Sequence, residues 1–441
     1  MRPMREPYPH QKKAAAFLFD RPRAALFDEQ GLGKTTSALL AIDQVWKSVD
    51  LCRPALVVAP ASVAHNWRSE AYAVMPWLRD VDVFVKDKGT RRIKSDVQPM
   101  VYITTHSLMR SKKVIEEIEK LKPGIVVLDE AHYMRNRTAA MTRSFYRLVR
   151  DLHPMHAWNL TGTPMPNWPA DLFTWLKSYH PAEFPESFIK FRNQYHDVTP
   201  SDYGEGVRIV GQRNISELKR RMSGLFMRRR TEDVIDLPVL RHESYAVHAP
   251  LDGAMLDLDE ELSRRWNVAT DDEERMRVLL DDAGLSRFRR WCGMAKVEPI
   301  VALLRTEIES EPDPKKVVFY HHQAVGDALQ DALRCRLRIE GSTPSALRPR
   351  IVEDFQSGEH PVILCQLQAA STGITLTASN DLLFAEQSWS PGEMAQAAKR
   401  IHRIGQRRRS RVRHVFAEGT VDELVARVLQ RKTAAIQEAL A

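Results

Sequence analysis

The sequence has few cysteines, no long apolar run and no low-complexity tract. Its 441 residues include only four cysteines, and no two of them have the CxxC spacing of a zinc site. No apolar run approaches the ~20 residues that a membrane-spanning helix needs, and the polar start lacks the apolar core of a secretory signal. These absences argue against a disulfide framework and against a membrane protein, and they predict a reducing environment inside the cell.

The composition also disfavours disorder and repeat architectures. Hydrophobic residues make up 43% and charged residues 28% of the chain, as in ordinary globular domains.

Lysine and arginine number 65 against 57 acidic residues, which gives a net charge of +8. A basic chain of this size is either simply soluble or binds polyanions. Its basic clusters, at residues 219–221, 228–230 and 400–413, are solvated surface on the first alternative and nucleic-acid contacts on the second.

Short apolar segments alternate with amphipathic stretches in both halves of the chain. The apolar segments are β-branched and bounded by proline, glycine or charge, which is typical of strands buried on both faces. Helix patterns lie between them, and this alternation predicts βαβ units and parallel sheets in an α/β fold. The expected strands are residues 55–59, 81–85, 100–104, 125–128, 317–320, 362–365, 381–385 and 412–416.

Two α/β lobes of similar size are expected, because 441 residues exceed what one core usually organises. Charge is dense and strand signals are few over residues 187–231 and 251–295, which predicts a helical insertion in each segment. The Leu237-Pro238 dipeptide lies between the two segments. We therefore place lobe one at residues 1–237 and lobe two at residues 238–441, with one insertion in each.

A glycine-rich turn followed by a helix pattern occupies residues 28–35, with the sequence DEQGLGKT. Gly31 and Gly33 let backbone N–H groups approach an anion, Lys34 can contact phosphates, and the Thr35 hydroxyl can bind Mg²⁺. The usual phosphate-loop pattern has glycine where Asp28 stands. By pattern alone, an accidental glycine-rich turn is the alternative.

Two adjacent acids, Asp129 and Glu130, directly follow the apolar segment 125–128. An acid at the end of a buried strand is costly to place without a partner. Beside a phosphate loop, Asp129 can hold Mg²⁺, largely through water, and Glu130 can polarise an attacking water. For either acid alone a solvated strand end is the alternative, and the pair after a phosphate loop favours nucleotide hydrolysis.

Four motifs follow one another along the chain: DEQGLGKT at residues 28–35, DEAH at 129–132, LTGTP at 160–164 and QAAKRIHRIGQ at 396–406. In wording and order they resemble the Swi/Snf-related ATPases of helicase superfamily two, most closely the annealing-helicase branch. That family has aspartate at the start of its phosphate loop, so Asp28 fits the pattern. The resemblance implies two RecA-like lobes in tandem with helical insertions.

The resemblance also implies roles for individual residues, with ATP and Mg²⁺ as cofactors. Gln11 would read adenine, and Mg²⁺ would be held by Thr35 and Asp129. The expected nucleotide-binding residues are Gln11, Gly31, Leu32, Gly33, Lys34, Thr35 and Thr36. The residues expected to couple hydrolysis to lobe movement are His132, Thr161, Gly162, Thr163 and Gln396. The expected DNA contacts are Ser62, Asn66, Trp67, Thr105, His106, Ser371, Thr372 and Thr375.

Two arginines in the last motif, Arg400 and Arg403, lie three residues apart and share one face of a helical turn. In the family these positions are arginine fingers, for which a planar guanidinium that stays charged is well suited. The expected catalytic set is Lys34, Asp129, Glu130, Arg400 and Arg403.

The sequence therefore predicts a DNA-dependent ATPase, an intracellular, monomeric motor that moves on double-stranded DNA and serves repair, replication or remodelling. We place it in the cytoplasm of a bacterial or virus-infected cell, or in the nucleus of a eukaryote. Forked or single-stranded DNA is a further possible ligand, and targeting would come from the motor or from a protein partner. Two alternatives remain: an RNA helicase of the same superfamily, and a nucleotide-gated DNA clamp with little turnover.

Overall fold

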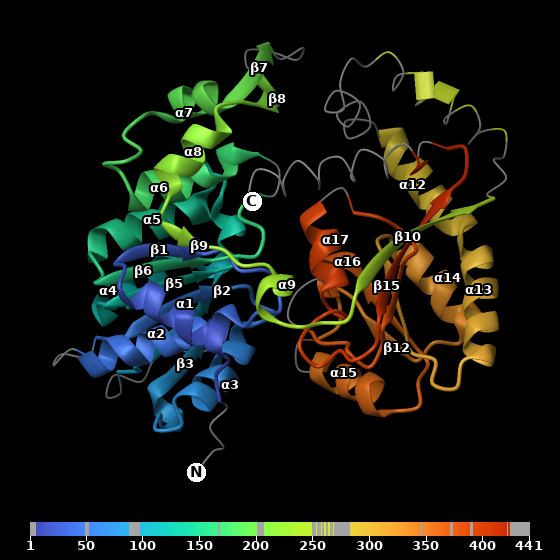
Figure 1. The fold of residues 1–441 in the computed structure, drawn as a ribbon, viewed down its shortest axis with the longest axis horizontal. Coiled ribbons are helices and arrows are strands. Elements are labelled where there is room, and N and C mark those ends of the chain that lie inside the picture. The colour runs from blue at the N-terminus through green and yellow to red at the C-terminus, as the bar shows by residue number, and fades with distance from the viewer. Residues whose placement is uncertain are drawn as a thin grey trace. The chain divides into compact units, whose positions relative to one another are not determined.

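The computed structural model divides the chain into two compact units, Met1–Asp236 and Leu237–Ala441, which we call lobe one and lobe two (Figure 1). The structure describes residues 6–48, 53–87, 98–165, 168–200, 207–248, 283–344, 347–370, 374–388, 391–420 and 422–423, with isolated positions between 253 and 268. Among these residues, no helix combines the length and the apolarity needed to cross a bilayer.

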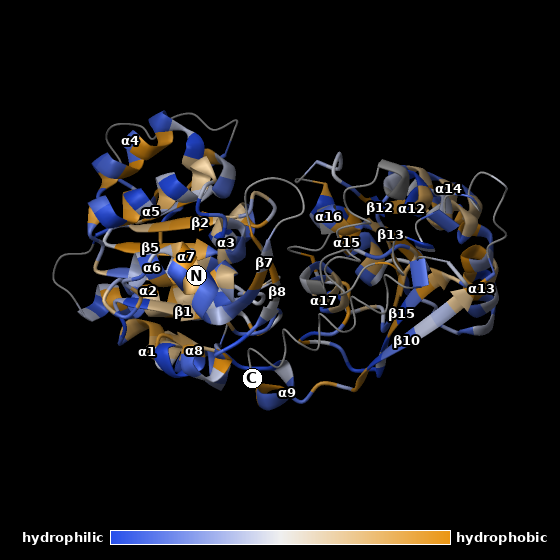
Figure 2. Cartoon of the chain, turned by 90° about the horizontal axis from the view of Figure 1, so that it is seen from above, coloured by the Kyte–Doolittle hydropathy of each residue, from blue (hydrophilic) through white to orange (hydrophobic). Residues whose placement is uncertain are grey.

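Lobe one is built on a seven-stranded sheet in the order β3-β4-β2-β5-β6-β1-β9, in which every pair is parallel. β2 and β5 lie near its centre and are coloured almost wholly as hydrophobic in Figure 2. Such strands are buried on both faces, because helices cover both sides of a parallel sheet. The strands are β1 (Arg23–Leu26), β2 (Ala55–Ala59), β3 (Val83–Lys86), β4 (Val101–Thr105), β5 (Ile125–Asp129), β6 (His156–Leu160) and β9 (Phe226–Met227).

The helices of lobe one connect successive strands. On one face of the sheet, Leu39 and Ile42 of α2 and Trp67 of α3 belong to the same buried cluster as Val57 of β2. The α-helices are α1 (Pro9–Phe19), α2 (Lys34–Ser48), α3 (Ala64–Val74), α4 (Lys112–Leu121), α5 (Ala140–Leu152), α6 (Phe173–Tyr179) and α9 (Thr231–Val234). The 3-10 turns are η1 (Asp80–Asp82), η2 (His106–Arg110), η3 (Ala131–Met134) and η4 (Pro169–Leu172).

The segment expected as a helical insertion at residues 187–231 is only partly helical. It contains α7 (Phe188–Tyr195) and α8 (Ile215–Met222), but also β7 (His196–Pro200) and β8 (Val207–Gln212). These two strands pair antiparallel and form a separate small sheet. The high charge of the segment concealed the strands, because an exposed hairpin shows little apolar alternation. Most of the second expected insertion, residues 251–295, lies outside the described residues.

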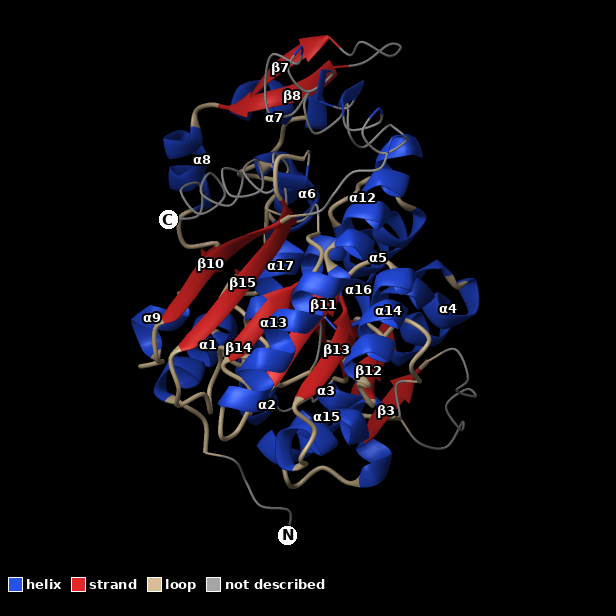
Figure 3. Cartoon of the chain, turned by 90° about the vertical axis from the view of Figure 1, so that its right-hand side faces the viewer, coloured by secondary structure: helices blue, strands red, loops and turns tan. Residues whose placement is uncertain are grey.

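Lobe two is built on a six-stranded, all-parallel sheet in the order β10-β15-β14-β11-β13-β12 (Figure 3). Alternate residues of β11 face different clusters: Val317 and Phe319 belong to one, Val318 and Tyr320 to the other. Helices therefore pack on both faces of the sheet. The strands are β10 (Leu240–Val247), β11 (Lys316–Tyr320), β12 (Leu337–Ile339), β13 (Val362–Gln366), β14 (Asp381–Phe384) and β15 (Ser410–Ala417).

The helices of lobe two divide between these two clusters. Leu304 of α13 and Leu329 of α14 lie in one, and Phe355 of α15 and Ala397 of α17 in the other. The helices are α12 (Ala283–Ala295), α13 (Val297–Ser310), α14 (Gln323–Leu333), α15 (Arg348–Ser357), α16 (Leu367–Ala370) and α17 (Pro391–Ala398). The predicted fold class, two tandem parallel-sheet α/β lobes, is confirmed.

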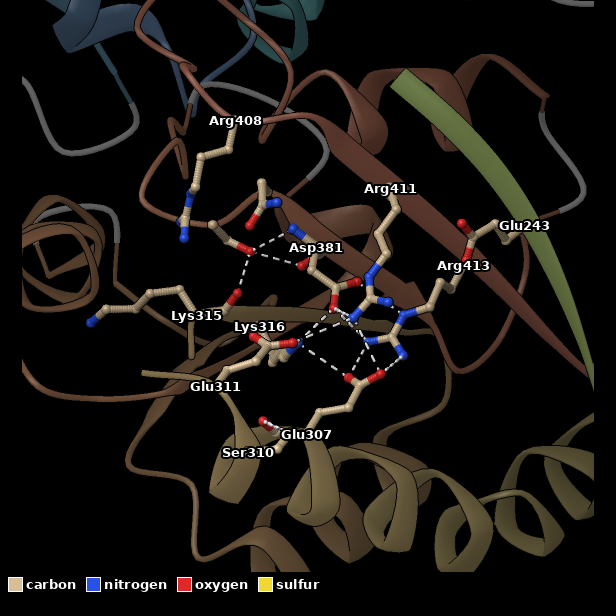
Figure 4. A network of polar contacts seen from close by, with 12 residues as sticks. Glu243, Glu307, Ser310, Glu311, Lys315, Lys316, Asp381, Arg408, Arg411 and Arg413 are labelled. Carbon is tan, nitrogen blue, oxygen red and sulfur yellow. Dashed lines mark hydrogen bonds and ion pairs between the residues drawn. The ribbon is translucent and has the colours of Figure 1, made fainter. Parts of the chain in front are cut away.

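One of the C-terminal arginines, Arg413, is part of the core of lobe two, and a second, Arg411, joins the same charged network while its side chain stays 33% exposed. Arg413 is 0% exposed, and its guanidinium donates to Asp381 at 2.9 and 2.7 Å and to Glu307 at 2.8 and 3.0 Å. Lys316 and Arg411 also donate to Asp381, at 2.8 and 2.7 Å (Figure 4). Burial opposes ionisation of Asp381, but Arg413, Lys316 and Arg411 together lower its pKa below the ordinary value.

We expect Asp381→Ala to destabilise lobe two by about 3–5 kcal/mol, because it leaves buried cations without their shared anion. Urea unfolding followed by hydrogen exchange of the β14 amides would measure this. The control is Asp327→Ala, since the Asp327 side chain is 55% exposed beside Arg338 and such pairs contribute less than about 1 kcal/mol. Equal stability of the two variants would contradict a structural role for the network.

The network around Asp381 also determines the sign with which the stability of lobe two depends on pH. Because the pKa of Asp381 is lowered by folding, its contribution is complete above the ordinary aspartate pKa of about 4 and is lost as the pH falls through the native value.

Candidate functional site

Three loops of lobe one meet at the carboxyl edge of its sheet. They follow β1, β5 and β6, which are adjacent and parallel, with β6 between the other two. The loops carry the sequences DEQGLGKT, DEAH and LTGTP. In parallel α/β sheets this edge is where ligands bind. The fold therefore brings together motifs that are about 100 residues apart in sequence.

The phosphate-loop candidate wraps around the beginning of α2, whose first residue is Lys34. Gly31 and Gly33 have positive φ angles, 92° and 78°, which a residue with a Cβ rarely adopts. The Lys34 ammonium is buried and donates to the backbone carbonyls of Asp28 at 2.8 Å and Glu29 at 3.2 Å. The loop thus folds around its own lysine, at a helix N-terminus suited to an anion.

The two acids that open this loop are fixed by a segment 200 residues later in the sequence. Asp28 is 1% exposed and is paired with Arg229, whose Nε lies 3.0 Å from Oδ1. Glu29 accepts from the Thr231 backbone N–H at 3.1 Å and from its hydroxyl at 2.8 Å. Asp28 therefore anchors the loop to the segment that precedes the lobe boundary. Glycine, the usual residue at position 28, could form no such ion pair.

Gln11, expected to read adenine, lies against the phosphate loop. Its Oε1 accepts from the Tyr8 N–H at 3.0 Å, and its Nε2 donates to the Leu32 carbonyl at 3.3 Å. A Cβ at position 33 would lie 2.1 Å from Gln11 Nε2, so a larger residue there would displace the Gln11 amide, and the positive φ independently favours glycine. Both ends of the amide are engaged within lobe one.

Asp129 is buried at the end of β5, and the Trp67 indole donates to its Oδ2 at 2.8 Å. Burial, together with the neighbouring charge of Glu130, raises the pKa of Asp129, while the bond from Trp67 and the charge of Lys34 act against this rise. Carboxylate and hydroxyl oxygens, as on Asp129 and Thr35, are the kind of donor that Mg²⁺ prefers, so the chemistry of these residues fits that ion.

Glu130, His132 and the LTGTP loop form one polar network. His132 Nδ1 lies 2.9 Å from Thr161 Oγ1, 3.3 Å from Thr163 Oγ1 and 3.3 Å from Glu130 Oε2. The Thr161 hydroxyl donates to Glu130 Oε2 at 3.4 Å. Glu130 has a left-handed backbone with φ of 47°, an uncommon conformation for a residue with a side chain and one often found at functional sites. The structure therefore links these two motifs directly.

Three further residues have less direct support. Thr35, at the beginning of α2, is partly exposed. Thr36 is buried, and its hydroxyl donates to Glu70 at 3.1 Å rather than facing the phosphate loop. Gly162 leaves room for Gln30, because a Cβ there would lie 2.6 Å from Gln30 Nε2. Among the described residues, no cluster of three or more His, Cys, Asp or Glu side chains could hold a metal by itself.

The residues expected to contact DNA divide into exposed and buried groups. Ser62 and Asn66 are exposed at the beginning of α3. Trp67 and Thr105 are 1% and 4% exposed, so neither offers a surface to DNA in this structure. His106 is also buried, and Nε2 bonds the Asp129 carbonyl at 2.8 Å. These three side chains therefore belong to the interior of lobe one in this structure, and their contact with DNA stays a prediction.

His106 must be neutral near pH 7, because burial lowers its pKa to about 4. Its Nε2 lies 2.8 Å from the Asp129 carbonyl oxygen.

In lobe two, the QAAKRIHRIGQ motif packs against the segment that follows residue 373. Arg400 is buried and donates to the Ile374 carbonyl at 3.2 Å. Arg403 is partly exposed and donates to Thr375 Oγ1 at 2.8 Å. Gln396 is buried in α17. Two expected DNA contacts, Ser371 and Thr372, lie outside the described residues.

Several residues that hold the site together were not predicted from the sequence. Arg229 and Thr231 brace the phosphate loop. In lobe two, Gln406 donates to the carbonyls of residues 377, 379 and 401 at 3.2, 2.7 and 3.0 Å. The need for one such residue could have been predicted from the sequence. Asp28 stands where the usual pattern has glycine, and a buried acid requires a partner.

Comparisons with known proteins agree with this arrangement of motifs. Residues 10–255 match the SNF2-related domain, and residues 295–405 match the helicase conserved C-terminal domain. The chain is similar, at 30% identity over 96% of its length, to a SWI/SNF-related matrix-associated actin-dependent regulator of chromatin subfamily A-like protein 1 homolog from Caenorhabditis elegans. It is 28% identical, again over 96% of its length, to the DNA annealing helicase and endonuclease ZRANB3 of Mus musculus.

The chain spans about half the length of the curated relatives it matches: 60% of the first protein and 40% of the second. Among solved structures, the Sulfolobus solfataricus SWI2/SNF2 ATPase core in complex with dsDNA aligns with 99% of this chain and 94% of that chain, at 21% identity and a TM-score of 0.45.

Proposed function

This chain belongs to the SNF2-related family of helicase superfamily two, a family of DNA-dependent ATPases, and on that premise we propose that it is an ATP-driven motor that moves along duplex DNA. The family resemblance seen in the motifs is thereby confirmed. The proposal extends it to the movement itself and to the residues responsible.

One observation carries the proposal: the Glu130–His132–Thr161 network joins the hydrolysis motif to the LTGTP loop. A change in the position of Glu130 as the reaction proceeds would alter contacts to Thr161 and Thr163. Hydrolysis of the nucleotide would thus change side-chain contacts outside the phosphate loop, as a motor requires. A nucleotide-gated clamp would need such a link as well, so steady-state phosphate release is the measurement that distinguishes it from a motor.

Within lobe one, each residue has a distinct task in hydrolysis. Lys34 exchanges its two backbone carbonyls for phosphate oxygens, while Gly31 and Gly33 let backbone N–H groups approach. Thr35 and Asp129 would hold Mg²⁺, which when bound neutralises charge on the phosphates. Glu130 orients and polarises the attacking water. Gln11 would contact the adenine base, and its position against the phosphate loop supports this role.

Lobe two supplies the positive charge that completes the site in this proposal. Arg403 is the better candidate for a finger, because it is partly exposed, whereas Arg400 is buried against the Ile374 carbonyl. Ser62, Asn66 and Thr375 are the remaining candidates for DNA contacts. The motor would act as a monomer inside the cell, with any protein partner serving to target it.

The mouse relative's name as a DNA annealing helicase raises a second candidate, the rewinding of separated strands. An RNA helicase is a third. Duplex, single-stranded and forked DNA should be compared with duplex RNA as stimulators of phosphate release, alongside strand-displacement and annealing assays. Stimulation by RNA equal to that by duplex DNA would contradict the proposed substrate.

We expect duplex DNA to stimulate ATP hydrolysis and to bind with a strong salt dependence and little sequence preference. Contacts to backbone phosphates release counterions, so log affinity falls by about 0.9 per phosphate contact for each log unit of salt. Fluorescence anisotropy at several salt concentrations, with oligonucleotides of unrelated sequence, would measure both. Lys34→Ala is the control for hydrolysis by this site. A salt-insensitive, sequence-selective affinity would contradict the proposal.

A further inference from the structure

Lobe one carries a basic groove of about 780 Å³ on the flank of its sheet. Its walls come from α5 and α6 and from the segments next to them (Figure 1). Five cationic residues line it, and the lining residues include no aspartate or glutamate. The cations are Arg137, Arg143, Arg147, Arg150 and Lys177.

Within the described part of the chain, the central cations of this groove have no acidic partner. Arg143 and Arg147 are exposed on α5, and no carboxylate among the described residues forms an ion pair with either. Arg150 pairs with Asp151, and the two side chains are 71% and 52% exposed. Arg137 lies over the Phe188 ring, 4.6 Å from its centroid. Uncompensated cations gathered in a groove repel one another, and an anion would relieve this repulsion.

The spacing of the α5 arginines suits a regular row of phosphates. Positions 143, 147 and 150 follow one another at four and three residues, so they share one face of the helix. At 1.5 Å per residue they span about 10 Å. Phosphates of one DNA strand recur about every 3.4 Å along the duplex axis, so this row covers about three such steps.

The groove begins beside the carboxyl edge of the sheet, where α5 begins, and it follows α5 away from that edge. α5 follows β5 and η3 and precedes β6, so it begins near the carboxyl edge of the sheet and ends near the opposite edge. The groove therefore lies along the flank, separate from the exposed Ser62 and Asn66 at the beginning of α3.

We propose that this groove binds the phosphodiester backbone of duplex DNA, as a second contact of lobe one. The inference rests on the proposed function for its ligand. Arginine forks bind phosphate oxygens in pairs, and the hydroxyls of Ser144 and Ser178, which also line the groove, add neutral donors. The contact lengthens the grip on DNA without reading its sequence.

The first test removes two charges that no carboxylate neutralises. R143Q/R147Q should weaken binding of a duplex oligonucleotide roughly 10- to 100-fold at about 0.1 M salt and reduce the log–log salt slope by about 1.8, because two phosphate contacts are lost. The matched control is K113Q/K120Q, which removes two exposed lysines of α4 that do not line the groove. Both pairs lie on helix surfaces and glutamine is a good helix former, so folding should be retained.

The second test locates the DNA directly. A photo-crosslinking amino acid placed at the exposed position of Ser178 should label duplex DNA, whereas one at Lys113 should not. Unlabelled acidic peptide added in excess should not compete.

The outcomes separate this inference from the function on which it rests. If duplex DNA does not stimulate the unchanged protein, the proposed function fails. If stimulation is intact but R143Q/R147Q binds DNA like the control and position 178 does not crosslink, the groove proposal is overturned. Competition by acidic peptide would assign the groove to a protein ligand and overturn it as well.

Discussion

Replacement of Arg403 by alanine is expected to lower DNA-stimulated ATP hydrolysis by about 10³- to 10⁵-fold, which is what an arginine finger contributes to phosphoryl transfer. ATP should still bind, because the phosphate loop and Lys34 belong to lobe one. Measurements of ATP affinity, DNA affinity and steady-state phosphate release on one variant would separate these effects. The expected signature is a loss confined to turnover.

Two controls give this experiment its meaning. Arg407→Ala removes an exposed arginine four residues away and should leave turnover near that of the unchanged protein. Thr375→Val removes the hydroxyl that now accepts from Arg403 at 2.8 Å, and should cost less than loss of the guanidinium itself. If Arg403 merely supported its own lobe, its loss would act like that of an ordinary surface contact, about 0–1 kcal/mol, and turnover would hardly change.

Glu130→Gln should retain ATP binding but slow hydrolysis by about 10²- to 10⁴-fold, the range expected for loss of a general base. The amide preserves the shape of the side chain and can still contact Thr161 and His132, but it lacks the charge that polarises water. Phosphate release and trapping of labelled ATP would be measured together. A variant that turns over normally would place the base elsewhere.

His132→Gln is the companion change, since it alters the same network without removing the acid. It should leave more hydrolysis than Glu130→Gln, while weakening the link between hydrolysis and movement on DNA. A triplex-displacement assay, which reports movement, would show a larger loss than phosphate release does.

Sequence reasoning predicted most of the central strands, because their apolar composition is local. Residues 55–59 and 362–365 agree with β2 and β13 to within a residue. It did not predict β1 and β6, since Arg23, His156 and Asn159 interrupt the apolar pattern although their strands lie in the sheet. Their burial comes from neighbouring strands, which local composition does not report.

Sequence reasoning likewise predicted one part of the candidate site and not another. The order of the motifs indicated that Lys34, Asp129 and Glu130 would meet, and parallel strands bring their loops to one edge. The direction of individual side chains was not accessible, because it depends on tertiary partners. Trp67 was expected on DNA, yet it turns inward to donate to Asp129. Likewise, Arg413 belongs to a charged core that no run of arginines would suggest.

The ion pair between Asp28 and Arg229 determines how long a fragment of lobe one must be. β9 completes the first sheet by pairing with β1, and Arg229 and Thr231 follow it. A fragment ending before residue 226 would remove an edge strand and leave the buried Asp28 carboxylate without its guanidinium. Lobe one, made alone as a recombinant fragment, should therefore extend at least through Val234, the last residue of α9.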